Sequence, residues 1–496
     1  MSKLSPGDRE ELFQALRDMG GAGQAESENR DLFGRRFYPV PEHLRAFSPD
    51  VTLIVGERGS GKSELFGAAM RFELLPVAAR YASGVRLPPL DAARTKWQAA
   101  YPVEAQFPDS GGLHRFLKEN SFAPRAAQQL WFAYLVRVLE PELDAGARNE
   151  LAALFSPQGG DALGVMEAFN EAGEAPLLVL DRFDERLVQA DRWQFVGYDE
   201  LDTLADYDWQ TMGTAISGLV SFWASYSRRW RRLRAKIFMR TDLFRRNTSS
   251  LSADLPKLAS NRVEISWSDR NLYAMLIKRI ANSLPALQAY CASSRIGFKG
   301  QDRVLGWIPE IAEAEDAKSL IQRMIGPYMG ANKNKGLTFN WLLDHIRDGQ
   351  DKAYPRALVR LIEQAAVNEI EIPKAGYSRL IDPTSLRRAI EKVSELQVTQ
   401  AISNEWPWLE GVRQRIKGES VPMTRRLLEH LLSKDWSRSW NLHRAIRPPA
   451  EDQRVFVNYL VELGIMRQRG DGRLDTPDLY QSGLGLKRKG GVRRNK

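Results

Sequence analysis

The sequence has few of the residues that zinc-binding and disulfide-stabilised proteins use. Its 496 residues include a single cysteine, Cys291, and five histidines. One cysteine cannot form an internal disulfide, and the scattered histidines form neither an H-E-x-x-H motif nor a Cys/His cluster. A zinc site within the protein is therefore not expected.

Long apolar runs are also missing. No window approaches the roughly 18 consecutive apolar residues of a membrane span, and the N-terminal MSKLSPGDREELFQALRDMGG lacks the apolar core of a signal peptide. The composition is otherwise that of a globular protein, with 43% hydrophobic and 27% charged residues. We expect a soluble, cytoplasmic protein without membrane contact, long enough for roughly three domains.

Positive charge exceeds negative charge. Lys and Arg together number 71 against 62 Asp and Glu, which gives a formal net charge of +9. This balance favours anionic partners without specifying one. The excess is concentrated in segments 228–236 and 487–496. Such runs are either solvated surface or a nucleic-acid contact, and for the C-terminal run both interpretations stay open.

The clearest motif is VGERGSGKSEL, at 55–65. The pattern G-x-x-x-x-G-K-(S/T) is complete, and a buried-strand run at 51–55 precedes it while a helical stretch follows it. In this order a strand, a glycine loop and a helix form a phosphate-binding loop, because loop amides and the helix N-terminus face one anion. The required positions are filled by Gly56, Gly61, Lys62 and Ser63.

This loop predicts a site for ATP with Mg²⁺. The β- and γ-phosphates are expected over the amides of 59–62, where Lys62 would reach them as a point charge. The Ser63 hydroxyl would ligate Mg²⁺. The residues expected to bind the nucleotide are Gly56, Glu57, Arg58, Gly59, Ser60, Gly61, Lys62, Ser63 and Glu64.

Three further apolar runs predict strands, at 177–180, 237–239 and 263–265. Because helical segments alternate with them, they indicate an α/β fold, a P-loop NTPase parallel sheet with helices on both faces. The interval between the loop and the first of these runs is long for one crossover. We therefore expect an additional strand and a helical insertion at about 72–175.

Carboxylates follow the run at 177–180. Asp181 would stand at the carboxyl end of a strand, where ligands of an open parallel sheet bind, and is expected to help hold Mg²⁺. Its alternative role is a helix cap. Asp184 and Glu185, one turn further on, are the candidates for the base or water-orienting group near the γ-phosphate.

Four more residues are candidates for the site. Arg240 and Thr241 end the run at 237–239, where one of them would sense the γ-phosphate or cap a helix. Arg262 precedes the next run and would act on a neighbouring subunit's nucleotide, which requires an oligomer; a surface arginine is the alternative. Arg356, in YPRALVRL, heads a helix that could reach the phosphates from the other side.

The remainder of the chain divides into helical parts. The pattern is helical from about residue 272, and from about 421 two helices are followed by an alternating stretch around 470–472 that indicates a β-hairpin. Helices followed by a hairpin describe a winged helix. The predicted parts are an N-terminal helical arm at 1–46, a P-loop core at 47–280, a helical lid at 281–418, a winged helix at 419–480 and a basic disordered tail at 481–496.

The motifs together resemble a known family. GERGSGKS, LLVLDRFDE, KIFMRTDLF, SNRVEISWSDRNLYAMLIKRI and PRALVRLI, in that order and followed by a winged helix, resemble bacterial AAA+ and STAND-type P-loop ATPases of KAP-like or origin-recognition-like kind. The resemblance covers 37–477 and implies ATP hydrolysis. Many such bacterial proteins belong to mobile-element or anti-phage defence. By the resemblance, 56–63 is Walker A, Asp181 the Walker B aspartate, Arg240 or Thr241 sensor 1, and Arg356 sensor 2.

One position departs from that pattern. Origin-recognition ATPases carry a glutamate directly after the Walker B aspartate, whereas Arg182 follows Asp181. Either Glu185 or Asp184 takes over the role, or hydrolysis is slow. Two functions therefore stand: an ATP-hydrolysing switch acting through an oligomer or partner protein, or an ATP-dependent DNA-binding initiator or transposition regulator. A small-molecule kinase fits less well, because nothing after the loop resembles an acceptor pocket.

The winged helix itself has a precedent in DNA binding and in protein contact. Glu451 and Asp452 begin its second helix and would face DNA phosphates unfavourably. Four arginines favour DNA contact instead: Arg454, Arg467, Arg469 and Arg473.

Overall fold

The computed structural model describes residues 6–20, 30–71, 74–81, 94–102, 110–120, 125–158, 161–204, 209–248, 258, 260–373, 379–433, 448, 450 and 452–489. The chain forms two compact units. One comprises Pro39–Ser266 and contains the glycine-rich loop. The other combines Met1–Tyr38 with Trp267–Lys496.

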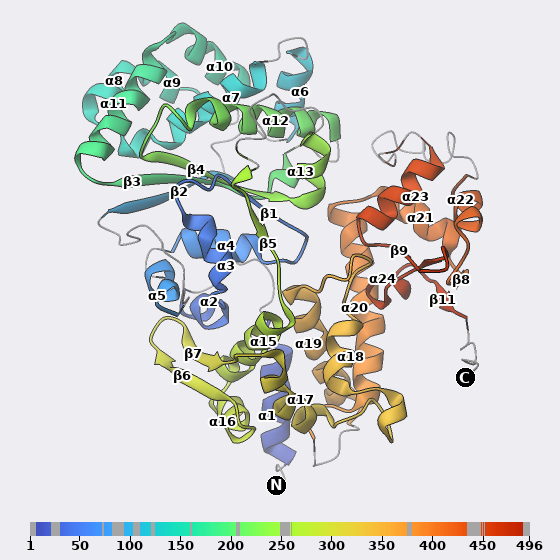
Figure 1. The fold of residues 1–496 in the computed structure, drawn as a ribbon. Helices are drawn as coiled ribbons and strands as arrows, with labels where there is room; N and C mark the ends of the chain where they lie inside the picture. Colours follow the sequence, from blue (N-terminus) through green and yellow to red (C-terminus); the bar gives the residue numbers. More distant parts are fainter. Residues whose placement is uncertain are drawn as a thin grey trace. The chain divides into compact units, whose positions relative to one another are not determined.

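A five-stranded parallel sheet forms the centre of the unit Pro39–Ser266 (Figure 1). The strands in their order across it are β2 (Thr95–Tyr101), β3 (Trp193–Tyr198), β4 (Leu233–Arg240), β1 (Leu53–Gly56) and β5 (Val263–Ile265). β1 and residues 237–239 of β4 are buried on both faces, which explains their continuous apolar sequences. The predicted parallel sheet is confirmed, as are its strands at 51–55, 237–239 and 263–265.

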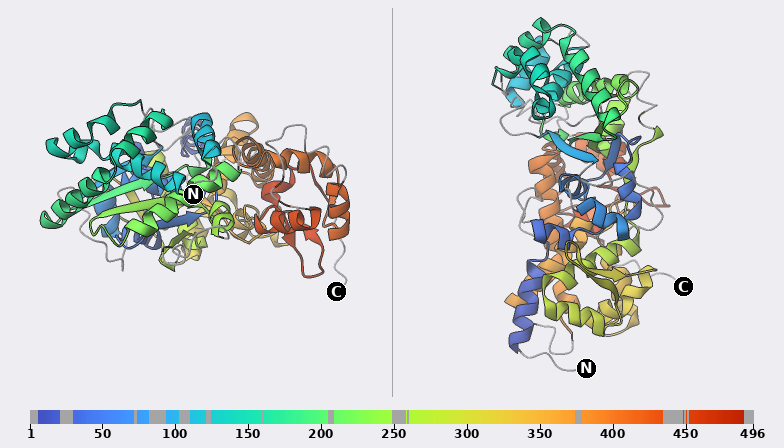
Figure 2. Two further views of the ribbon diagram at one scale, coloured as in Figure 1. Left: turned by 90° about the horizontal axis from the view of Figure 1, so that it is seen from above. Right: turned by 90° about the vertical axis from the view of Figure 1, so that its left-hand side faces the viewer.

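Helices cover both faces of this sheet (Figures 1 and 2). α4 (Lys62–Ala69) packs on one face, where Gly197 of β3 lies so close to Phe66 that an added Cβ would come within 2.7 Å of that ring. α7 (Ala126–Val138), α11 (Ala175–Gln189) and α12 (Trp209–Tyr226) cover the other face. The indole of Trp131 in α7 donates to the Ala215 carbonyl of α12, at 2.7 Å.

The prediction of a strand at 177–180 is wrong, because this run lies within α11. The helix has Pro176 in its first turn, and its buried side chains recur with helical spacing well past Asp181. A four-residue apolar run has the same appearance in a buried strand and in a buried helix. The buried side chains of α11 are Pro176, Val179, Leu180, Phe183, Asp184 and Leu187.

The strand that neighbours β4 is instead β3, which the sequence analysis did not identify. The additional strand expected in the long interval is confirmed as β2. The shorter elements of the unit are α3 (Pro41–Leu44), η1 (Arg45–Phe47), α5 (Leu74–Tyr81), α6 (Ser110–Glu119), η2 (Glu140–Glu142), α8 (Ala145–Glu150), α9 (Ala152–Phe155), α10 (Ala162–Glu171), η3 (Leu201–Thr203) and α13 (Thr241–Thr248).

The other unit is mostly helical. Its first part consists of α1 (Pro6–Arg17), α2 (Arg30–Arg36), α15 (Asp269–Ser283), α16 (Pro285–Ser293), β6 (Gly297–Asp302), β7 (Gly306–Glu310), η4 (Ala314–Ala317), α17 (Lys318–Ile325), η5 (Lys333–Lys335), α18 (Thr338–Asp344), α19 (Pro355–Glu371) and α20 (Pro383–Asn404). Asp382 caps α20 by accepting from the Thr384 amide at 2.8 Å. The buried Glu369 of α19 accepts from the Asp382 amide at 2.9 Å and so joins the two helices.

The C-terminal part contains α21 (Trp408–Ile416), β8 (Ser420–Val421), α22 (Arg425–Ser433), α23 (Gln453–Glu462), β9 (Arg467–Gln468), β10 (Leu474–Asp475), α24 (Asp478–Gln481) and β11 (Lys487–Arg488). The predicted hairpin is confirmed, since β9 and β10 pair antiparallel. β11 pairs with β8, so the prediction of a disordered tail from residue 481 is wrong as far as Lys489. Residues 490–496 of that tail lie outside the described residues. Across the described chain, none of the helices has the length and apolar character that a membrane crossing requires.

Candidate nucleotide-binding site

The glycine-rich loop connects β1 to α4 with a backbone that only glycine adopts readily. Gly59 and Gly61 have φ values of 73° and 94°, in the left-handed region. Gly61 stands at the N-terminus of α4 without a side-chain cap. The first amides of α4 and the positive end of its dipole are thus available to an anion at this point.

Lys62 lies folded back over the loop. Its ammonium donates to the carbonyls of Gly56 and Glu57, at 2.9 Å each. Burial lowers the pKa of Lys62 to about 8, against the opposing influence of the Asp199 carboxylate. This partly buried ammonium contacts neutral carbonyls, so the arrival of an anion is favoured because phosphate oxygens would form ion pairs with it.

Asp199 is the carboxylate that the structure places beside the loop. It follows the last residue of β3, only 2% of its surface is exposed, and the Ser63 hydroxyl lies close enough to influence its charge. Burial raises the pKa of Asp199, and the nearby Ser63 hydroxyl opposes that shift. Its Oδ2 atom has no hydrogen-bond partner among the described residues.

These oxygens fit a magnesium ion. Mg²⁺ in nucleotide sites is bound by one or two protein oxygens together with phosphates and water. The Ser63 hydroxyl and the unpartnered Oδ2 of Asp199 are such oxygens on adjoining elements. An orphaned carboxylate oxygen in a buried position is costly unless a cation compensates for it.

A second carboxylate follows directly. Glu200 is half-buried and has φ 51° and ψ 31°, a left-handed conformation that is uncommon for a residue with a side chain. Its carbonyl accepts from the Thr203 amide at 2.9 Å and from the Thr203 hydroxyl at 2.8 Å. The Asp-Glu pair that the sequence analysis found missing at Arg182 is therefore present at the end of β3.

The end of β4 lies beside the loop as predicted, because β4 pairs with β1 and places Arg240 in register with Gly56. The Arg240 guanidinium donates to Asp242 at 3.0 and 2.6 Å and to Asp202 at 3.1 Å. Burial opposes its charge, but Asp242 and Asp202 raise the pKa of Arg240 above its usual value. The buried hydroxyl of Thr241 has no partner among the described residues.

Asp181 lies at the opposite edge of the sheet. Its carboxylate accepts from Arg229 at 2.8 and 2.5 Å and from the Trp230 indole at 3.0 Å. Both donors precede the first residue of β4, whereas the loop follows the last residue of the parallel strand β1. The assignment of Asp181 to Mg²⁺ is therefore wrong, because the two ends of the sheet are separated by the length of its strands.

Asp184 and Glu185 belong to the same edge. The buried Asp184 carboxylate accepts from three successive backbone amides, those of 231–233, at 2.7 to 2.8 Å. It therefore fixes the turn into β4. Glu185 is exposed on α11. Neither carboxylate lies at the carboxyl edge of the sheet, and both predictions of a catalytic role are wrong for the same reason as that of Asp181.

Two predicted arginines are exposed. Arg262 precedes β5 at the amino edge of the sheet, with its guanidinium 5.3 Å from the centre of the Phe244 ring. Phe244 belongs to α13, the helix that directly follows Arg240, and an action of Arg262 on a neighbouring subunit stays a prediction. Arg356 is exposed in the first turn of α19, in the other unit. Its contact with phosphates also stays a prediction.

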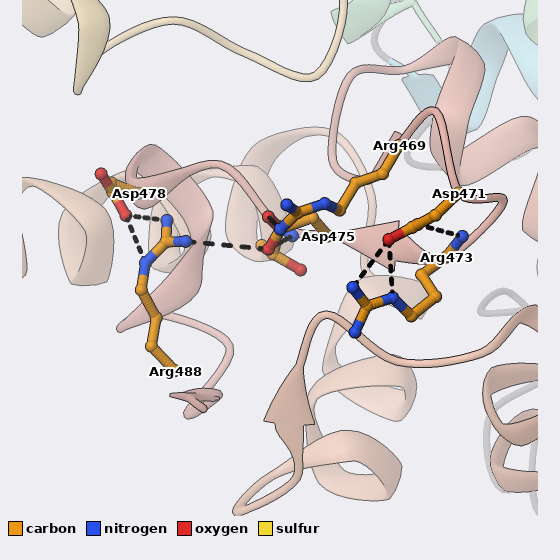
Figure 3. Close-up of polar contacts among 7 residues, drawn as sticks. Arg469, Asp471, Arg473, Asp475, Asp478 and Arg488 are labelled. Carbon is orange, nitrogen blue, oxygen red and sulfur yellow. Dashed lines mark hydrogen bonds and ion pairs between the residues drawn. The ribbon is translucent and has the colours of Figure 1, made fainter. Parts of the chain in front are cut away.

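Two arginines of the C-terminal hairpin and one of β11 are paired with carboxylates (Figure 3). Arg469 contacts Asp475 at 3.3 Å, and Arg473 contacts Asp471 at 2.7 Å. Arg488 lies between Asp475 and Asp478. Part of the positive charge expected to favour DNA is thus neutralised within the hairpin region.

The start of α23 also differs from its sequence-based interpretation. Asp452 accepts from the amides of Arg454 and Val455 at 2.8 and 2.9 Å, so it is the helix cap. Glu451 lies outside the described residues. Arg454 and Arg467 are exposed on α23 and β9.

The residues that sequence reasoning missed are Asp199, Glu200 and Asp202. Their signal is QFVGYDE, at 194–200, an aromatic and β-branched run that ends in two acidic residues. The run LLVLD, at 177–181, is more apolar and closer to the loop in sequence, so it was the stronger candidate for the strand beside the loop. The strand order, the glycine-rich loop and the proximity of Ser63 to Asp199 together define the fold of a P-loop nucleoside triphosphatase.

Comparisons with known proteins add little to this definition. No protein-family model matches the chain, and no curated protein matches it. The Aeropyrum pernix ORC2 protein in its ADPNP-ADP complexes is 14% identical over 95% of both chains, with a TM-score of 0.39. Its ADP form is 13% identical over 97% of this chain and 92% of that one, with a TM-score of 0.28. The Aeropyrum pernix ORC1 protein in complex with DNA is 12% identical over 97% and 93%, with a TM-score of 0.34.

Proposed function

We propose that the protein is a Mg²⁺-dependent P-loop ATPase that acts as a nucleotide-controlled switch. The observation that carries this proposal is the proximity of the Ser63 hydroxyl to the buried Asp199 carboxylate, whose pKa it lowers. It joins the phosphate loop to the carboxyl edge of the sheet, where a metal-bound nucleotide needs oxygen ligands. The AAA+ character of the switch is supported by the motif order of the sequence and by the Asp-Glu pair at the end of β3.

Each residue of the site has a distinct role in this proposal. The loop amides and Lys62 bind the terminal phosphates, and Ser63 and Asp199 would hold Mg²⁺, which supplies positive charge to the phosphate oxygens when bound. Glu200 orients the attacking water and accepts its proton. Arg240 or Thr241, beside the loop, responds to the γ-phosphate.

Calorimetric titration with Mg-ATP and assays of phosphate release test this function. Wild-type protein is expected to bind Mg-ATP and to release phosphate, and Lys62→Ala is expected to weaken binding by at least about tenfold, as loss of a charge-assisted contact requires. Lys392→Ala, at an exposed lysine paired with Glu395, is the matched control and should behave as wild type. Phosphate transferred to a metabolite instead of water would indicate a kinase.

We further propose that the switch acts through an oligomer or a partner protein. The exposure of Arg262 supports this, because an arginine that completes another subunit's site must be reachable. Sedimentation with and without a non-hydrolysable ATP analogue tests it. A monomer in both conditions would exclude Arg262 from the site. Arg356 is tested separately: phosphate release at the wild-type rate by Arg356→Ala would exclude Arg356 from the site.

An ATP-dependent DNA-binding initiator is the second candidate. It is favoured by exposed arginines of the C-terminal part, among them Arg454 on α23 and Arg467 on β9. Fluorescence anisotropy with labelled duplex DNA tests it at two salt concentrations, with and without ATP. The double variant Arg454→Glu, Arg467→Glu should lose binding, whereas Arg473→Gln, already paired with Asp471, should retain most of it. ATP-dependent binding without turnover would favour the initiator over the hydrolysing switch.

We also propose a role in anti-phage defence, which is more specific than ATPase activity. The sequence motifs alone support this role. It predicts that cells producing the protein resist phage infection in plating assays. Lys62→Ala should abolish that resistance at equal protein levels. Unchanged plating with the wild-type protein would leave the ATPase proposal intact and remove the defence role.

A further inference from the structure

Two carboxylates accept hydrogen bonds from Arg240, and one of them holds the guanidinium less firmly than the other. Asp242 accepts two bonds from the guanidinium, and the side chains of both residues are nearly inaccessible, with exposures of 6% and 7%. Asp202 accepts one bond, at 3.1 Å, and its side chain is 29% exposed. A singly bonded, more exposed carboxylate is the easier one to replace, because water compensates for the bond that it loses. Asp202 is thus the exchangeable partner of Arg240.

This pair lies within electrostatic reach of the phosphate loop. Arg240 is in register with Gly56, and the charges of Arg240 and Asp202 both influence the pKa of Lys62. A terminal phosphate bound at Lys62 therefore comes into the field of the same guanidinium. Phosphate carries more negative charge than a carboxylate and presents three acceptor oxygens to arginine. It would compete with Asp202 for the Nη1 donor.

Asp202 belongs to the turn that carries Glu200. In η3 the carbonyl of Glu200 is held by the amide and hydroxyl of Thr203, and the Tyr101 hydroxyl lies 2.8 Å from that same hydroxyl. Glu200 keeps a left-handed conformation, with φ 51°, which these contacts must maintain. A change in the hold on Asp202 therefore acts on the backbone of Glu200, two residues away.

We propose that Asp202 is a positioning residue that distinguishes ATP from ADP. Without a γ-phosphate, Asp202 holds Arg240 and keeps the turn of η3 closed. A γ-phosphate takes the Nη1 donor of Arg240, and the released turn repositions Glu200. The γ-phosphate biases the two states because it alone makes the additional contact with Arg240. This inference rests on the proposed ATPase function. It identifies Asp202 and Arg240 as the pair through which the site distinguishes the two nucleotides.

Asp202→Asn tests the proposal, since it keeps the size of the side chain and removes its charge. Dissociation constants for ADP and for a non-hydrolysable ATP analogue are measured by calorimetry in the presence of Mg²⁺. The ratio of the ADP constant to the analogue constant should rise about fivefold or more, because only the analogue displaces Asp202. Asp191→Asn is the matched control, at an exposed aspartate that pairs with Arg94 and Arg232 before β3. Its ratio should equal that of wild type.

A second variant changes Arg240 instead of Asp202. Arg240→Lys keeps the charge but removes the forked donors, so the ratio should fall toward one. If Asp202→Asn bound ADP and the ATP analogue more tightly by the same factor, the variant would show a general charge effect. That result would overturn the proposal and leave the ATPase function intact. Wild-type protein that binds neither nucleotide would overturn the ATPase function and Asp202's role with it.

Discussion

The Ser63 hydroxyl, in the first turn of α4, lowers the pKa of the Asp199 carboxylate at the end of β3. The carboxylate is buried, and burial raises its pKa. Its Oδ2 atom lacks a partner within the described part of the chain. Such a group destabilises the nucleotide-free protein and becomes favourable only when a cation arrives.

Asp199→Asn should therefore separate stability from function. The folded state raises the pKa of Asp199, so it binds that proton more tightly than the unfolded chain. The group consequently costs stability once the pH has risen above its unfolded pKa, and most when the carboxylate is fully charged in both states. Removing the charge should raise the melting temperature of the nucleotide-free protein at neutral pH, by about 2–4 °C for each kcal/mol gained.

The same variant should lose Mg²⁺-dependent binding. Calorimetry with Mg-ATP, and with ATP plus EDTA, measures the metal contribution directly. We expect that contribution to disappear and phosphate release to fall by about a hundredfold or more, as loss of a charged group at developing charge implies. A lower melting temperature together with wild-type turnover would contradict the assignment of Asp199.

The pKa of Lys62 predicts a pH dependence of nucleotide binding. Its value of about 8 lies below the usual lysine value, so the free protein loses this positive charge as the pH rises through 8. Phosphate binding requires the charged form. Between pH 7 and pH 9 the affinity for Mg-ATP should therefore fall about tenfold, the change in the protonated fraction of a group of this pKa. Lys62→Ala should bind weakly with a flat profile over the same range, and an equally steep profile in that variant would assign the titration elsewhere.

The phosphate loop and three strands could be predicted because their signals are local. Gly59 and Gly61 adopt left-handed backbone angles, which glycine reaches readily because it has no side chain. This signal lies in the two residues themselves. β1 and the core of β4 are continuous apolar runs, as strands buried on both faces must be. The hairpin of β9 and β10 was likewise signalled by the glycine-flanked turn at 470–472.

The metal-site carboxylate could not be predicted because its strand depends on distant partners. β3 contains Gln194 and Gly197, which interrupt its apolar pattern, and Gly197 is needed because Phe66 of α4 and Met70 pack against it. The run at 177–180 is more apolar, but its apolar positions continue to Leu187 with helical spacing, which is typical of a buried helix. The error moved the predicted site to the wrong edge of the sheet, while the residues of β4 and the loop were placed correctly beside each other.

Asp184 should prove essential for stability. Its buried carboxylate accepts from the amides of 231–233, and Asp184→Ala would leave these donors without their partner. The free energy of unfolding, measured by urea denaturation, should fall by about 3 kcal/mol. Asp181→Ala in the same helix removes a partly exposed ion pair with Arg229 and one hydrogen bond from the Trp230 indole, and should cost less, about 1–2 kcal/mol. Equal losses in the two variants would show that the amide contacts contribute no more than the ion pair.

The two candidate glutamates can be compared directly. Glu200 follows Asp199 at the carboxyl edge of the sheet, and Glu185 is exposed on α11, the helix whose Asp184 holds the turn into β4 at the amino edge. Glu200→Gln keeps the shape of the side chain but cannot accept a proton, so phosphate release should fall about a hundredfold, the usual contribution of a general base, with Mg-ATP affinity within about threefold of wild type. Glu185→Gln is the matched control and should hydrolyse ATP at the wild-type rate, because its carboxylate lies across the sheet from the nucleotide. If phosphate release were lost in Glu185→Gln and retained in Glu200→Gln, the catalytic glutamate would have to come from α11, and the site built on β3 would be wrong.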